Sequence, residues 1–175
     1  MLFKNEEQII ENGQTKKLKK MRKDALEILD FSLNAVDPYK RVKSIFKEKT
    51  IVSEKIKINI SDFENVYLIG FGKASVSMAN AVCDSIDIKK GVVTTNNQYS
   101  IVGNDRIVTL VGTHPIPEEK NVENTDKIIE LVKEFNEKDL LIVVISGGGS
   151  SLLCKPSINL EDKKKTTDIL LKSGM

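Results

Sequence analysis

Short apolar segments alternate with helical segments from residue 66 to the end of the chain. The apolar segments predict buried strands at 66–70, 91–95, 106–113 and 140–146. Helical spacing of apolar residues predicts helices at 74–86, 121–136 and 160–174, the last with Asn159 as N-cap and Gly174 as C-cap. Nearly all-apolar strands that alternate with helices indicate a parallel sheet covered by helices on both faces. The sequence therefore predicts a Rossmann-like α/β fold.

The N-terminal region predicts helices that precede this sheet. Apolar residues keep helical spacing from Lys16 to Val36, the pair Asp37-Pro38 ends that helix, and a shorter helix is expected at 39–47. Alternating lysine and isoleucine in 51–60 predicts one half-exposed strand. We therefore predict an N-terminal helical segment at 1–50 and an α/β domain at 51–175.

Charge and composition argue against nucleic-acid and membrane partners. The chain carries a formal net charge of +2, and its 30% of charged residues are nearly balanced in sign. The basic run KKLKKMRK at 16–23 has no interleaved aromatic residues and lies on an amphipathic helix, so a solvated helix face is the favoured interpretation. No apolar run approaches the about 20 residues of a membrane span.

Cysteine and histidine content bears on the compartment and on metals. Cys83 and Cys154 form neither a disulfide framework nor a CxxC pair, which indicates a reducing compartment. Because acids stand where a signal peptide has basic and apolar residues, we expect a cytoplasmic protein. One histidine and two distant cysteines cannot build a zinc site, and the sequence leaves the ligands of any other metal unknown.

The first loop that can carry chemistry is GFGKAS, after the strand at 66–70. Gly70 and Gly72 allow a tight turn, and the next helix directs free N–H groups and its positive dipole end at the loop. Lys73 adds a positive charge there. This pattern predicts a site for phosphate or carboxylate, and the alternative is a glycine turn with a solvated lysine.

Two nucleotide-binding motifs are not matched by this loop. The dinucleotide fingerprint needs a third glycine where Ser75 stands, and the second strand ends in Thr-Thr-Asn-Asn with no acid to bind a ribose. A Walker A loop needs a glycine at position 67, which is tyrosine.

The third strand ends in GTHPIPEE, which contains the only histidine of the chain, His114. The two prolines of this loop, Pro115 and Pro117, stiffen it by fixing φ. At this edge of the sheet His114 can hydrogen-bond a ligand oxygen, although a lone histidine before proline is more often structural.

The fourth strand runs into a serine- and glycine-rich loop, Ser146, Gly147, Gly148, Gly149, Ser150 and Ser151. Without Cβ atoms in the way, the oxygens of an anion can approach successive backbone amides. The loop lacks the G-x-S-x-G pattern of a nucleophile elbow, because Leu152 replaces the last glycine. We therefore interpret it as an anion-binding loop, with a purely structural turn as the alternative.

Together these motifs resemble the N-terminal part of the MOFRL-type (class II) glycerate 2-kinases. The resemblance rests on AVDP, GFGKASVSMA, GTHPIPEE, SGGGSSLL and INLEDKKKTTDILLKSG, which occur in the order of the family from about residue 20 onwards. Glu118 stands where the family often has aspartate. Members of the family are more than twice as long as this chain, so we expect it to be an N-terminal fragment or truncated product that lacks the second domain.

The resemblance implies an activity and its cofactors. It implies ATP-dependent phosphorylation of D-glycerate to 2-phosphoglycerate with Mg²⁺, at a site between two α/β domains, with Lys73 as a catalytic residue. The fragment alone is then expected to be inactive, and the sequence leaves a homodimer open. Two alternatives remain: a sugar-phosphate-binding or isomerase-type domain without ATP chemistry, and a nicotinamide-dependent oxidoreductase.

Overall fold

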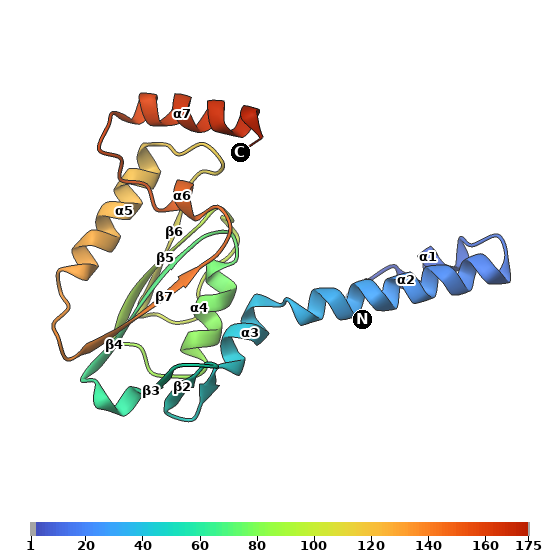
Figure 1. The fold of residues 1–175 in the computed structure, drawn as a ribbon, viewed down its shortest axis with the longest axis horizontal. Helices are drawn as coiled ribbons and strands as arrows, with labels where there is room; N and C mark the ends of the chain where they lie inside the picture. Colours follow the sequence, from blue (N-terminus) through green and yellow to red (C-terminus); the bar gives the residue numbers. More distant parts are fainter. Residues whose placement is uncertain (1–2, 175) are drawn as a thin grey trace.

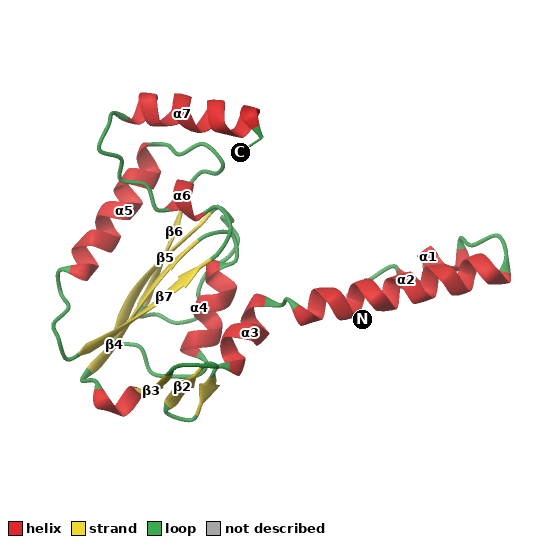
Figure 2. Ribbon diagram, in the orientation of Figure 1, coloured by secondary structure: helices red, strands yellow, loops and turns green. Residues whose placement is uncertain are grey.

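The computed structural model describes residues 3–174, so residues 1–2 and 175 at the ends of the predicted segments lie outside it. Its central feature is a parallel sheet in the order β6-β5-β4-β7 (Figure 2). The strands are β4 (Asn65–Phe71), β5 (Lys90–Thr95), β6 (Ile107–Val111) and β7 (Asp139–Ile145). The predicted Rossmann-like sheet is therefore confirmed.

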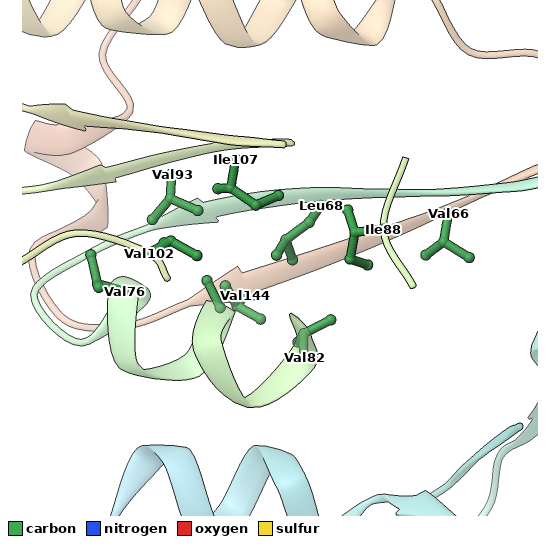
Figure 3. Close-up of a cluster of buried hydrophobic side chains, with 10 residues drawn as sticks. Val66, Leu68, Val76, Val82, Ile88, Val93, Val102, Ile107 and Val144 are labelled. Carbon is green, nitrogen blue, oxygen red and sulfur yellow. The ribbon is translucent and has the colours of Figure 1, made fainter. Parts of the chain in front are cut away.

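Helices cover the two faces of this sheet. On one face lies α4 (Ser75–Cys83), which connects β4 to β5, and on the other lies α5 (Glu119–Val132), which connects β6 to β7 (Figure 1). Side chains of β4 alternate between these faces. Leu68 packs in the cluster that contains Val76 and Val82 of α4 (Figure 3), whereas Tyr67 packs with Leu131 of α5. Burial on both faces explains why the strand is apolar throughout.

A small antiparallel sheet precedes the main one. It contains β1 (Phe46–Lys47), β2 (Thr50–Val52) and β3 (Lys57–Asn59). The single strand predicted at 51–60 is thus wrong, because a turn closed by the Ser53 amide and the Ile56 carbonyl oxygen at 2.9 Å divides it into two strands. Strand pairing begins inside the segment 1–50, while the division into two segments stays a prediction.

The N-terminal helices form an arm that projects from the sheet (Figure 1). It consists of α1 (Glu6–Glu11), which was not predicted, and α2 (Lys16–Ala35), which was. Arg22 Nη1 donates to the Ile9 carbonyl oxygen at 2.8 Å and joins the two helices. The next helix, α3 (Pro38–Ser44), is capped by Asp37 and is shorter than predicted because β1 follows it.

Two helices follow β7. The first, α6 (Gly149–Leu152), lies at the end of the sheet where the strands end, and α7 (Leu160–Ser173) lies beyond it (Figure 1). The predicted caps of α7 are confirmed, since the Asn159 side chain accepts from the Asp162 amide and Gly174 is left-handed with φ 77°. Within residues 3–174 no helix has the length and apolar character to cross a membrane.

Candidate functional site

The strand order places a reversal of direction between β4 and β7. From β4 the chain proceeds through β5 to β6 on one side and then returns to place β7 on the other side of β4. In open α/β sheets, ligands bind beyond the carboxyl ends of the strands at such a reversal. The segments after these two strands, 72–74 and 146–148, contain Lys73 and the first half of the predicted anion loop.

These two loops bind each other directly. The Lys73 amide donates to the Gly147 carbonyl oxygen, and the Ala74 amide donates to Ser146 Oγ, both at 2.9 Å. Gly72 makes this approach feasible, because its φ is 120° and a Cβ there would lie 2.5 Å from the Ser146 carbonyl oxygen. The first amides of the loop before α4 are therefore satisfied by the protein, where the sequence predicted that they were free for a ligand.

Gly70 has a packing function. It lies in β4, and a Cβ there would be 2.9 Å from Cγ2 of Val144 and 3.1 Å from Cγ2 of Val93. The residue is buried inside the sheet. Its side of the strand is thus filled by core side chains, and the structure does not bring Gly70 to the loops that follow β4 and β7.

The glycine run after β7 offers unpaired backbone donors. Within the described part of the chain, no acceptor is found for the amides of Gly147, Gly148, Gly149 and Ser150. Gly147 has open space where a Cβ would stand. Consecutive free amides of this kind attract anions. The predicted anion-binding function therefore remains available to this loop.

The three serines of this loop differ in their surroundings. Ser146 Oγ accepts from the Ala74 amide, and Ser151 is buried with its hydroxyl donating to the Pro115 carbonyl oxygen. Ser150 is exposed, and no residue of the described segment 3–174 bonds its hydroxyl. Ser150 thus keeps its whole hydroxyl for a ligand. Ser146, whose oxygen accepts from Ala74, keeps only its O–H donor, and Ser151 holds a neighbouring loop in place.

His114 brings the third loop to the same place. Gly148 has φ 84°, and a Cβ there would lie 2.6 Å from Cδ2 of the His114 ring, so the ring lies directly against the glycine run. Partial burial and then the charge of Lys73 lower the pKa of His114 from its ordinary value of 6.5. Lys73, His114 and the glycine run therefore converge, as the sequence predicted for one edge of the sheet.

Asn121, which the sequence interpretation missed, organises the loop that contains His114. This fully buried side chain accepts from the Thr113 amide at 3.0 Å and the Glu118 amide at 3.2 Å, and donates to the Ser151 carbonyl oxygen at 2.7 Å. The peptide bond between His114 and Pro115 is cis. The only signal in the sequence was the spacing from Glu118 to Asn121, which fits the start of a helix.

Lys73 itself is free to meet an anion. Its side chain is exposed, and none of the ion pairs found among residues 3–174 includes it.

The described residues also bear on metal binding. Across the described residues, no group of three or more His, Cys, Asp or Glu side chains is arranged to hold a metal ion. The site thus offers positive charge and amides but no metal-binding cluster.

Known proteins resemble this chain over most of its length. Residues 24–175 match a family described as a domain of unknown function (DUF4147). The chain is 37% identical over 161 residues to the glycerate 2-kinase of Pyrococcus horikoshii, covering 88% of this chain and 35% of that protein. It is 42% identical over 112 residues to an Agrobacterium vitis protein named as a candidate hydroxypyruvate reductase, covering 61% of this chain and 29% of that protein.

A solved structure shares the fold. The crystal structure of a glycerate kinase from Thermotoga maritima matches with a TM-score of 0.70 and 34% sequence identity, covering 89% of this chain and 36% of that one. The chain thus spans about 35% of the length of the curated glycerate kinases that it matches.

Proposed function

Because the chain belongs to the DUF4147 family, the N-terminal domain of the MOFRL-type glycerate 2-kinases, we propose that it is the N-terminal part of an enzyme that phosphorylates D-glycerate with ATP. The product is 2-phosphoglycerate. The observation that carries the proposal is the convergence of Lys73, His114 and the free amides of the glycine run. Phosphoryl transfer asks a protein mainly for positioning and for stabilisation of negative charge, and these groups supply both.

Lys73 acts as the catalytic cation in this proposal. It lies at the start of α4 beside the crevice, exposed and without an ion-pair partner in the described chain. A fixed positive charge at this position stabilises the negative charge that develops on the transferred phosphoryl group. Its backbone amide, which donates to the Gly147 carbonyl oxygen at 2.9 Å, holds the residue in place.

The glycine run binds the acceptor acid. The amides of Gly147, Gly148 and Gly149 donate to the carboxylate of D-glycerate, and the free hydroxyl of Ser150 adds a further donor. His114, whose lowered pKa keeps the imidazole neutral at pH 7, hydrogen-bonds a hydroxyl of the same molecule. Gly70, Gly72, Ser146 and Ser151 act indirectly, because they pack or bond the loops that carry these groups.

Magnesium does not fit the described residues as a preformed site. No cluster of potential ligands is present in residues 3–174. The carboxylate of Glu118 lies near Lys164 of α7, whose pKa is raised first by its hydrogen bond to Glu161 and further by the charge of Glu118.

The proposal is tested on the protein as its natural host produces it. An affinity tag is added before residue 1 in the host, and the tagged protein is purified from those cells. With D-glycerate and Mg-ATP it should release ADP, and NMR of the product should show the phosphate on the 2-hydroxyl. Lys73→Ala should lower kcat/KM by about 100-fold or more, the usual loss when a preorganised charge contact to a transition state is removed. Lys133→Ala, an exposed lysine at the end of α5, serves as the matched control and should keep full activity.

The alternatives give different results in the same assay. A sugar-phosphate-binding or isomerase-type protein would release no ADP with D-glycerate. An oxidoreductase would instead oxidise NADH or NADPH when hydroxypyruvate is supplied, which is the activity in the name of the Agrobacterium vitis relative. Either outcome, obtained with a folded protein, would overturn the proposal.

A further inference from the structure

A second hollow lies beside Lys73, away from the glycine run. Its volume is about 650 Å³, and its walls include Lys73, Ser77 and Asn80 from α4 and the turn before it, Tyr39 of α3, and Tyr99. A neighbouring hollow of about 510 Å³ shares Lys73 and Tyr99 and extends along residues 96–98 at the end of β5. Lys73 and Tyr99 thus stand where the two hollows meet.

The size of this space does not suit a three-carbon acid. Pockets of about 300 to 1,000 Å³ are typical of ligands the size of a drug or a cofactor. A nucleoside with its phosphates falls in this class, and D-glycerate is far smaller. The end of β5 is also the side of the sheet where doubly wound folds bind the nucleoside half of their ligands.

Tyr99 lies on a loop that is held in place by backbone amides and asparagine side chains rather than by the tyrosine ring. The Tyr99 amide donates to Asn97 Oδ1 at 3.0 Å, and the Gly103 amide donates to Asn80 Oδ1 at 2.8 Å. Val102 is buried in the core cluster and anchors the loop. Nevertheless the Tyr99 side chain is 86% exposed. An aromatic ring held on an anchored loop, over a hollow, is suited to stack against a nucleotide base.

Polar groups line the opposite wall. Asp84 Oδ2 accepts from the Tyr39 hydroxyl at 2.6 Å, which leaves the other carboxylate oxygen for a ligand hydroxyl or amino group. Asn80 Oδ1 accepts a hydrogen bond from the Gly103 amide. The side-chain nitrogen of Asn80 has no acceptor among residues 3–174 and can donate to a ligand. A few polar groups around an aromatic surface are the usual composition of a small-molecule site.

We propose that this cavity binds the nucleoside of the phosphoryl donor, with the base of ATP stacked on Tyr99 and its phosphates directed at Lys73. The inference rests on the proposed function, because it assigns a place to the donor of that reaction. Donor and acceptor then lie on opposite sides of Lys73, with the nucleoside along α4 and the acid at the glycine run. The nucleotide is thus held by this domain.

The test measures the affinity of the 175-residue chain for two ligands by calorimetry: Mg-ATP, and inorganic tripolyphosphate with Mg²⁺. Tyr99→Ala should weaken ATP binding by about 10-fold or more, since a base–aromatic contact is lost, and should leave tripolyphosphate binding unchanged. Tyr99→Phe keeps the ring and should bind ATP within about two-fold of the original chain. Lys73→Ala should weaken both ligands, because it removes the charge that meets the phosphates.

A matched control and a folding control complete the design. Phe31→Ala removes another strongly exposed aromatic ring, on α2 and outside the cavity, and should change neither affinity. Circular dichroism and the melting temperature of each variant establish that it is folded. Absence of ATP binding by the chain, or unchanged ATP affinity in a folded Tyr99→Ala variant, would overturn the inference.

Failure of this inference is distinguishable from failure of the proposed function. Tyr99-dependent binding of ATP without phosphorylation of D-glycerate by the protein purified from its own cells would support the nucleotide site and contradict the acceptor. Phosphorylation of D-glycerate with no effect of Tyr99→Ala on ATP affinity would support the kinase and place the nucleoside elsewhere.

Discussion

At the scale of single residues, burial and the positive charge of Lys73 lower the pKa of His114. Burial is the larger cause of the lowered His114 pKa, and Lys73 is the second. His114 is the only histidine of the chain, so NMR of its imidazole protons against pH gives one unambiguous titration. We expect a midpoint below 6.5. In Lys73→Met the midpoint should rise part of the way towards 6.5, whereas Lys133→Met should leave it unchanged.

The same shift gives a sign for stability against pH. The unfolded chain binds the His114 proton more readily than the folded chain, because the folded pKa is the lower one. The contribution of this group to stability is therefore complete above about pH 6.5 and is lost as the pH falls below it. A midpoint at or above 6.5, or no response to Lys73→Met, would contradict the convergence of these two side chains.

Two adjacent glycines of the anion loop make a matched pair. Gly148 has φ 84° and faces the His114 ring, whereas Gly147 has open space around the position of a Cβ. We expect Gly148→Ala to lower the free energy of unfolding by about 1–3 kcal/mol, the range for a non-glycine residue in a left-handed conformation. Gly147→Ala should stay within about 0.5 kcal/mol of the original chain. Urea unfolding measures both, and equal losses would show that the strain is not specific to Gly148.

At the scale of elements, the apolar runs of the sequence predicted the main sheet because its central strands, β4 and β5, are buried on both faces. Leu68 of β4 is an example, and it is buried with Val144 of β7 in the core cluster between the sheet and α4. The same reasoning failed at 51–60, because the alternation of polar residues and isoleucine that runs from Lys55 to Ile60 already begins inside the turn at 53–56 and hides it. No local signal distinguishes a long half-exposed strand from two short ones.

The candidate site was predicted less completely than the sheet. The sequence identifies Lys73, His114 and the glycine run as ends of parallel strands, which meet at one edge. It could not show that the Ala74 amide is taken by Ser146, or that Asn121 connects Thr113 to Ser151, because these contacts join segments far apart in the chain. Tyr99 was also missed, since an exposed ring in a loop has no periodic pattern.

The last helix contributes little to the core. No residue of α7 is buried, whereas Leu131 of α5 is 3% exposed. We therefore expect a chain that ends at Ser157 to lose less than about 0.5 kcal/mol of unfolding free energy in urea. Leu131→Ala should cost about 2–5 kcal/mol, because it leaves a cavity in the core. A larger loss for the shortened chain than for Leu131→Ala would mean that α7 packs against the sheet in solution.

At the scale of the whole molecule, one strip of the main sheet lacks a cover. Leu141, Val143 and Ile145 of β7 are 36–59% exposed, and they lie beside Tyr67, Ile69 and Phe71 on the face that α5 covers elsewhere. An apolar strip of this kind on an edge strand favours contact with further protein. The curated glycerate kinases that the chain matches are also much longer, since it spans about 35% of their length.

We expect the 175-residue chain alone to have no glycerate kinase activity. Lys73 and the glycine run supply charge stabilisation, but no cluster of metal ligands is found in residues 3–174, and the apolar strip of β7 is left exposed by this chain. The chain should nevertheless fold, because its sheet is buried on both faces over β4 and β5.

The decisive comparison is a coupled ADP-release assay with D-glycerate and Mg-ATP, run on the chain and on the protein purified from its own cells through a tag before residue 1. Circular dichroism and ATP-binding calorimetry on the same sample test first whether the isolated chain is folded and binds ATP, so that its inactivity can be attributed to the missing part of the site. A rate for the isolated chain of about a hundredth of that of the purified protein would mean that the activation barrier is only roughly 2.7 kcal/mol higher in the chain. That result would show that Lys73, His114 and the glycine run suffice for the reaction, and it would contradict the view that further protein completes the site.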